Sequence, residues 1–318
     1  MNGFRDPKDA PTIDVNLGFT EGGLGDCIAR TPAITWLART NPNVTFHHWV
    51  PDYYLDLANH FEAPYPNLLV KPLSEYKEKG QPYPGRQTEK GDKHTSLHTH
   101  PTAHAFRIYA DMESPYLADW DYPRLRLDEL PISGLTKPYV VITTGFTAPV
   151  RSWPAESINE VAEFIQGTGR DVVWLGRTTN DMGHGARIKA KFDKGVDYSI
   201  GLDFRNRTTL LQSARILAEA QAVVGVDNGL LHLAGCSDVP IVAGFTTVDP
   251  ATRLPYRSGG KLGYNCYTVE PDVGCRFCQT QMQFVYEFDF RQCFYKDLAC
   301  VSQMTGQKFI TQLKRVLK

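Results

Sequence analysis

The stretch VVGVDNGLLHLA, residues 223–234, decides the fold that the sequence predicts. An apolar, β-branched run ends at Asp227, and a short helical segment starts near Gly229. A buried strand that runs straight into a helix is the building unit of parallel α/β sheets. The stretch therefore predicts a βα turn whose polar residues follow a buried strand.

The same alternation of apolar runs and helical segments continues on both sides of this stretch. We expect strands at 12–17, 44–50, 67–71, 139–144, 171–175, 222–226, 240–244 and 264–269. We expect helices at 24–39, 52–61, 154–166, 208–220 and 230–235. Thr208 is expected to cap its helix, and Pro32 is expected to kink or restart the first one. The alternation predicts an α/β fold with parallel sheets.

The length of the chain and two breaks in its pattern indicate two domains. A chain of 318 residues is long enough for two domains of ordinary size. Residues 76–104 are rich in Lys, Gly, Pro, Thr and His and predict a polar insertion, and 131–138 predicts a seam. We therefore expect one domain at 1–134 and a second at 135–318.

Composition and charge disfavour several classes of partner. The net charge of −1 and the pI near 6.7 give no general attraction to nucleic acid or anionic membranes, so a nucleic-acid acceptor is disfavoured. No apolar run approaches the ~20 residues of a membrane span. Residues 1–14 are polar and lack the apolar core of a signal peptide. We expect a cytoplasmic protein with reduced cysteines.

The turn at residues 227–230 has the features of an anion site. The N–H groups of Asn228, Gly229 and Leu230 would point out of the helix start, where a phosphate binds readily. The carboxylate of Asp227 can hold sugar or ribose hydroxyls, and His232 would lie one turn further along the helix. The alternative is a tight turn in which Asp227 caps the helix and His232 is a satisfied core histidine.

A second motif, TAPVRSWP at 147–154, follows the expected strand 139–144. Arg151 offers a permanent charge and a fork of donors that suit a diphosphate, and Thr147 adds a hydroxyl. In the alternative interpretation Arg151 is a surface residue. Trp153 is best interpreted as a core anchor.

A third motif, EGGLGD at 21–26, opens the first expected helix. Gly22, Gly23 and Gly25 allow a tight turn and a close approach to a ligand. Asp26 would lie beside the helix start, where a carboxylate can accept a proton from an acceptor hydroxyl. The alternative is an ordinary βα turn in which Asp26 caps the helix.

Cysteines and histidines form two further clusters. Cys275, Cys278, Cys293 and Cys300 begin with the spacing of a metal knuckle, and four thiolates suit a structural zinc or iron ion. Two disulfides or free thiols are the alternatives. Cys27, Cys236 and Cys266 are interpreted as ordinary small residues. His94, His98, His100 and His104 could bind metal, but a solvated loop explains them better.

Taken in order, the motifs resemble the heptosyltransferase family, glycosyltransferase family 9. GLGDCIARTPA (23–33) is similar to the family's G-x-G-D…T-P-A, RSWP (151–154) to its K/R-x-W-P, and DNGLLHLA (227–234) to its D-[ST]-G-x-x-H-x-A. Residues 240–250 resemble the following strand and its F-G-x-T-x-P loop, with Thr246 in place of Gly. Asn228 stands where Ser or Thr is usual, and Arg151 where Lys is familiar. The cysteine cluster resembles the metal finger of heptosyltransferases that glycosylate autotransporters.

The resemblance implies a GT-B fold, with two Rossmann-like domains facing across a cleft and the final helix, about 305–317, near the seam. It also implies single-step inversion at the anomeric carbon, without a catalytic cofactor or a divalent metal on the diphosphate. Asp26 would be the general base, and Arg151 with Thr147 would hold the departing diphosphate. Asp227 and the N–H groups beside it would bind the donor, expected to be ADP-heptose, with support from His232. The acceptor would be a glycan, a protein or another biomolecule.

Two other functions fit the same architecture. A nucleotide-sugar epimerase would need further acid–base residues around the donor sugar, and no clear second set is present. A non-catalytic nucleotide-sugar-binding protein would have lost the chemistry, and the presence of both Asp26 and Arg151 argues against it.

Overall fold

The computed structural model describes residues 12–16, 23–61, 65–78, 122–129, 134–144, 148–177, 195–257, 261–281 and 293–318. The chain divides into two compact units. The first is Met1–Glu129 with Ser258–Gly260, and the second is Leu130–Arg257 with Lys261–Lys318. The acceptor and donor roles of these units stay a prediction.

The second unit is built on a six-stranded parallel sheet in the order β11-β8-β7-β4-β5-β6. The strands are β4 (Tyr139–Thr143), β5 (Asp171–Leu175), β6 (Leu202–Asp203), β7 (Ala222–Val226), β8 (Ile241–Gly244) and β11 (Cys266–Val269). Counted along this unit, the order is the 3-2-1-4-5-6 of a dinucleotide-binding fold. The direction of the connections reverses between β4 and β7, so a ligand crevice is expected outside the carboxyl ends of these two strands.

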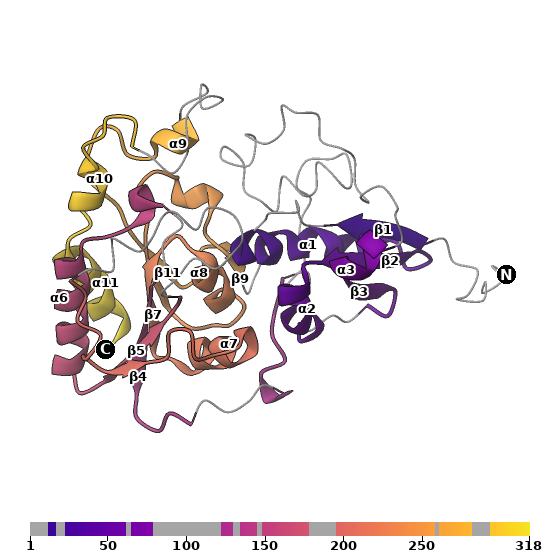
Figure 1. The fold of residues 1–318 in the computed structure, drawn as a ribbon, viewed down its shortest axis with the longest axis horizontal. Helices are drawn as coiled ribbons and strands as arrows, with labels where there is room; N and C mark the ends of the chain where they lie inside the picture. Colours follow the sequence, from indigo (N-terminus) through magenta and orange to yellow (C-terminus); the bar gives the residue numbers. More distant parts are fainter. Residues whose placement is uncertain are drawn as a thin grey trace. The chain divides into compact units, whose positions relative to one another are not determined.

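Helices cover both faces of this sheet (Figure 1). Helices α6 (Ala155–Gly167) and α11 (Gly306–Val316) lie on one face, and α7 (Leu210–Glu219) and α8 (Gly229–Ala234) lie on the other. The central strands β4, β7 and β8 are buried along their whole length and mostly apolar because both faces are covered. The face under α6 and α11 forms the main core, with Trp153, Trp174 and Phe309 as its largest side chains.

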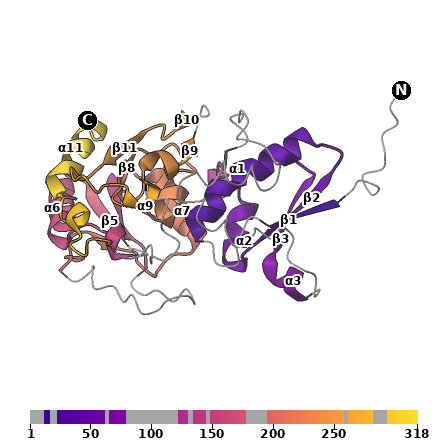
Figure 2. The same cartoon turned by 90° about the horizontal axis from the view of Figure 1, so that it is seen from above.

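The first unit contains a parallel sheet in the order β1-β2-β3. Its elements are β1 (Thr12–Asn16), α1 (Leu24–Thr40), β2 (Thr45–Val50), α2 (Asp52–Asn59), β3 (Leu68–Pro72) and α3 (Leu73–Glu78). Strand side chains alternate between the two faces. Phe46 packs against Ile34 of α1, whereas Trp49 packs against Tyr76 of α3. Helices α1 and α3 therefore cover opposite faces (Figure 2).

Short elements complete the structure. They are the 3-10 helices η4 (Leu127–Glu129), η5 (Pro149–Arg151) and η6 (Pro250–Thr252), the antiparallel pair β9 (Tyr256–Arg257) and β10 (Lys261–Leu262), and the helices α9 (Cys278–Gln281) and α10 (Ala299–Ser302). No helix within the described ranges is long and apolar enough to cross a bilayer.

One local prediction is wrong and another is narrowed. Thr209, not Thr208, caps α7: its hydroxyl accepts from the Gln212 N–H while the Gln212 side chain accepts from the Thr209 N–H, a reciprocal pair that sets the helix start. Helix α1 runs through Pro32 without restarting, and its buried neighbours Thr31 and Ala33 hold the helix there. A kink at Pro32 stays a prediction.

Candidate active site

Strands β4 and β7 end next to each other where the connections of the second unit reverse, and both are followed by charged residues. Arg151 closes η5, which follows β4, and Asp227 comes directly after β7. These residues therefore follow the two strands beside which this fold binds its ligands.

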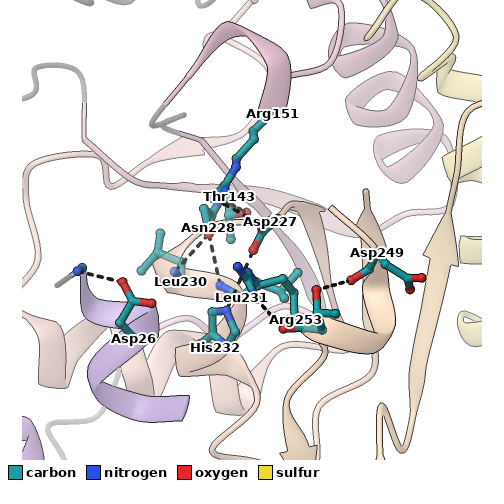
Figure 3. Close-up of polar contacts among 12 residues, drawn as sticks. Asp26, Thr143, Arg151, Asp227, Asn228, Leu230, Leu231, His232, Asp249 and Arg253 are labelled. Atoms are coloured by element: carbon teal, nitrogen blue, oxygen red, sulfur yellow. Dashed lines mark hydrogen bonds and ion pairs between the residues drawn. The ribbon is translucent and has the colours of Figure 1, made fainter. Parts of the chain in front are cut away.

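Arg151 and Asp227 form an ion pair (Figure 3). Nη1 of Arg151 lies 3.3 Å from Oδ2 of Asp227, and their side chains are 16% and 7% exposed. Trp153, 1% exposed, anchors the segment after η5 against Phe309 of α11, with ring centroids 4.1 Å apart. Arg151 is thus turned toward the end of β7 and is not the surface residue of the alternative interpretation.

The side chain of Asn228 organises the turn at residues 227–230, which we name the β7 turn. Its Oδ1 accepts the N–H groups of Leu230 at 3.0 Å and Leu231 at 3.1 Å, and its Nδ2 donates to Oγ1 of Thr143 at 3.2 Å. Asn228 therefore caps α8 and also ties β7 to the end of β4. A serine or threonine in this place has one hydroxyl for these tasks, whereas the amide has separate donor and acceptor groups.

The cap corrects two expectations. The Leu230 N–H is occupied by Asn228 and does not point freely out of the helix, because the amide side chain reaches over it. Asp227 is not the cap of α8, since Asn228 takes that position. Asn228, Gly229 and Leu230 remain partly exposed, so the β7 turn is not packed shut.

Gly225 lets β4 and β7 approach each other closely. A Cβ at this position would lie 1.9 Å from Oγ1 of Thr143, so a larger residue would displace the threonine that receives the Asn228 amide. The sequence pattern did not single out Thr143, because the partner that gives it a role lies 85 residues further along the chain.

His232 lies on the other side of the Asp227 carboxylate. Its Nε2 is 3.9 Å from Oδ1 of Asp227, and the side chain is 6% exposed. The imidazole is therefore a buried neighbour of the Asp227 carboxylate, on the helix that follows the β7 turn.

Asp26 lies in the first turn of α1, in the first unit. Its Oδ2 accepts the Gly23 N–H at 3.1 Å, so the capping interaction of the alternative interpretation is present. We name residues 23–26, which include Gly25, the α1 turn. One oxygen of a carboxylate can cap while the other accepts a proton, so capping leaves the predicted role of Asp26 as a base open. Gly22, Thr147 and the four histidines of the insertion lie outside the described residues.

The four late cysteines come into one region. All seven cysteines are described and none forms a disulfide, so the disulfide interpretation is wrong. Burial, followed by the neighbouring thiols Cys278, Cys275 and Cys293, raises the pKa of the Cys300 thiol to about 12. Among the described residues, no three His, Cys, Asp or Glu side chains are arranged to hold a metal ion. The thiols are thus close enough to interact but do not have ligand geometry.

Sequence comparison supports a family assignment for this chain. The model of glycosyltransferase family 9 (heptosyltransferase) matches residues 92–267 of the 318, more than half of the chain. Lipopolysaccharide heptosyltransferase 1 of Pseudomonas aeruginosa is 28% identical over 183 residues, covering 57% of this chain and 48% of that protein. The Salmonella typhimurium enzyme of the same name is 28% identical over 139 residues, covering 44% and 41%. The chain thus aligns with less than half of the length of these relatives.

Solved structures show a similar fold. The iron-containing dodecameric glycosyltransferase TibC of enterotoxigenic E. coli has a TM-score of 0.68 at 20% identity, over 96% of this chain and 79% of that one. Its complex with ADP-D-β-D-heptose scores 0.67 at 18% identity, covering 98% and 78%. E. coli heptosyltransferase WaaC with ADP scores 0.57 at 15% identity, covering 96% and 99%.

These likenesses confirm the predicted GT-B fold class, and the two parallel sheets agree with it. With the family match over 92–267, the chain belongs to glycosyltransferase family 9, the heptosyltransferase family.

Proposed function

We propose that this protein is an inverting glycosyltransferase that moves a heptose from ADP-heptose to a hydroxyl of a glycan or protein acceptor. The observation that carries the proposal is the Arg151–Asp227 pair, which follows β4 and β7 where the connections reverse. The ADP-heptose bound by TibC and the ADP bound by WaaC favour this donor over other nucleotide sugars.

Arg151 is the residue that we assign to the donor diphosphate. The leaving nucleoside diphosphate gains negative charge as the glycosidic bond breaks, and a guanidinium aimed at that charge stabilises the transition state more than the ground state. Asp227 holds one edge of the guanidinium through Nη1. Because a guanidinium has five donors in a fixed fork, the remaining N–H groups can bind phosphate oxygens. The hydroxyl of Thr147 is proposed to donate a further hydrogen bond to the diphosphate.

Asp26 is proposed to act as the general base toward the acceptor hydroxyl. A carboxylate that removes the hydroxyl proton as the new bond forms makes the oxygen a better nucleophile, and attack opposite the leaving diphosphate inverts the anomeric carbon. The Gly23 N–H fixes the carboxylate at the helix start. Asp227, Gly229 and His232 are proposed to bind or support the donor sugar and phosphate. Asn228 and Leu230 are proposed to shape that turn through the cap.

The four clustered thiols are proposed to hold a structural zinc or iron ion. The donor set, Cys275, Cys278, Cys293 and Cys300, matches such an ion in ligand type, because soft thiolates prefer these metals. Their proximity supports the proposal, and so does the iron-containing structural neighbour. A bound cation would stabilise the charged thiolates and would link residues 275–278 to residues 293–300. Elemental analysis of the purified protein should find about one metal ion per chain, which substitution of Cys275 and Cys278 by Ser removes.

The transfer reaction is tested with ADP-heptose, a panel of acceptor glycans and acceptor peptides, and NMR of the products. The proposal expects a product of inverted anomeric configuration and release of ADP, both dependent on Asp26. With donor alone, the sugar configuration should remain unchanged. Epimerised donor, or binding of ADP without transfer to any acceptor under conditions where TibC and WaaC transfer heptose, would contradict it.

A further inference from the structure

Thr246 occupies the place where the family's loop usually has glycine, and the structure gives its side chain a contact. Its hydroxyl donates to the carbonyl of Val150, the residue immediately before Arg151. Thr246 and Val150 are both buried, at 3% and 0% exposure. A glycine could not make this bond, so the hydroxyl is a specific attachment between the loop after β8 and η5.

The other side of this loop is bonded to residues of the cysteine segment, the name that we give to residues 275–281 and 293–302, which carry the four clustered cysteines. The carbonyls of Thr246 and Thr247 accept the N–H groups of Phe277 and Gln279, each at 2.9 Å. The Asp249 N–H donates to Oγ1 of Thr280, also at 2.9 Å. Three hydrogen bonds thus join residues 246–249, which we name the 246–249 loop, to residues 277–280.

A second contact reaches η5 from the same cysteine segment. Helix α10, which carries Cys300, packs against η5. The short helix that ends at Arg151 is therefore held by the Thr246 hydroxyl and by α10. Both supports lead to clustered cysteines: α10 contains Cys300, and the 246–249 loop is bonded to the residues on either side of Cys278.

We propose that Thr246 is a positioning residue for Arg151, and that through it the cysteine segment sets the orientation of the guanidinium at the donor site. This inference rests on the proposed function for its catalytic meaning. Thr246 is not a catalytic residue. It acts through Val150 and η5, so its loss should weaken the binding of the diphosphate without removing any group that touches it.

Hydrogen exchange tests the attachment without any ligand. The Arg151 and Ser152 N–H groups donate to the carbonyls of Ala148 and Pro149 and report on the integrity of η5. In T246V these two amides should exchange about five-fold faster than in the wild type, the change expected when one net hydrogen bond is lost. T246S keeps a hydroxyl and should restore protection.

T252V is the matched control. Thr252 is also buried, and its hydroxyl also donates to a backbone carbonyl, that of Asp249, but its bond does not reach η5. Its Arg151 and Ser152 amides should exchange as in the wild type. Equal exchange of these amides in T246V and wild type would overturn the inference, as would equally fast exchange in T252V and T246V.

Calorimetry with ADP then separates this inference from the proposed function. If the inference holds, T246V should bind ADP about five-fold more weakly than wild type, and T246S should bind normally. ADP binding to T246V as tight as to the wild type would overturn the positioning role. Loss of protection in T246V together with no ADP binding by the wild type would support the attachment to η5 and reject the nucleotide function.

Discussion

Asn228 in the β7 turn bonds to Thr143, 85 residues earlier in the chain, whereas Asp26 in the α1 turn bonds to Gly23, three residues earlier. The two turns resemble each other in sequence, since each joins a glycine-containing segment to a helix with an aspartate beside it. They differ in what fixes that aspartate. Asp227 is held by an arginine from another strand end, and Asp26 is held by its own helix start. In the proposed function the two turns have different tasks: the β7 turn and Arg151 hold the leaving group, and the locally held Asp26 accepts the proton.

The sharpest test of this division is D26N. The amide oxygen of asparagine can still accept the Gly23 N–H, so α1 should start normally, but the amide cannot take a proton from the acceptor. We expect kcat to fall by about 10²–10⁴-fold, with donor KM nearly unchanged. Steady-state kinetics with a fixed acceptor measures this. Wild-type turnover in D26N would remove Asp26 from the mechanism.

R151A should cause the next largest fall in kcat, and it changes the partner of Asp227 in the β7 turn. Loss of a donor that stabilises the leaving group should lower kcat by about 10²–10³-fold. R151K keeps the charge but loses the planar fork, so it should recover part of the rate. The comparison of the two turns would fail if R151A changed only the acceptor KM.

The contribution of the Arg151–Asp227 ion pair to the β7 turn can be tested by measuring the free energy of unfolding. D227A leaves the Arg151 guanidinium largely buried without its partner, and breaking a buried pair in this way costs about 3–5 kcal/mol. The double variant D227A/R151M removes both charges and should recover much of the loss. Urea unfolding of the single and double variants measures the coupling, and additive losses would show that the pair contributes little.

G225A tests the close approach of β4 to β7. The added Cβ would lie 1.9 Å from Oγ1 of Thr143 and must displace it. Overpacking of this kind costs about 1–3 kcal/mol. G274A, where a Cβ would meet nothing within 4 Å, is the control. Equal melting temperatures for the two variants would contradict the tight packing.

Some features of the β7 turn could be predicted from the sequence, and others could not. The end of β7 at Asp227 was predictable because a run of apolar residues is a local signal, and the burial of Trp153 followed from its type and position. The cap by Asn228, the bond from Thr246 to Val150 and the Arg151–Asp227 pair were not predicted. The cap is a local contact that an asparagine just before a helix could have indicated. The Thr246 bond and the Arg151–Asp227 pair join segments that are distant in sequence, and no periodicity within either segment encodes the partner.

The first unit offers a separate test, a pH dependence of stability. Burial lowers the pKa of His48 in β2 from 6.5 to about 3. The unfolded chain therefore binds a proton that the folded chain excludes, so this contribution is complete above pH 6.5 and is lost as the pH falls toward 3. The slope approaches about 1.4 kcal/mol per pH unit.

Urea unfolding between pH 7 and pH 4.5 measures this slope, with H48L as the matched variant. The free energy of unfolding of H48L should decline less steeply than that of the wild type over this range. Parallel curves for the two proteins would show that His48 is not the group responsible.

The central claim is that the nucleotide diphosphate binds beside Arg151 and that Asp26 does not take part in that binding. Calorimetric titration of ADP into the wild type, D26N and R151A tests it directly. The account predicts equal dissociation constants for the wild type and D26N, and a constant at least about ten-fold larger for R151A. Equal affinity of R151A and the wild type for ADP would contradict it.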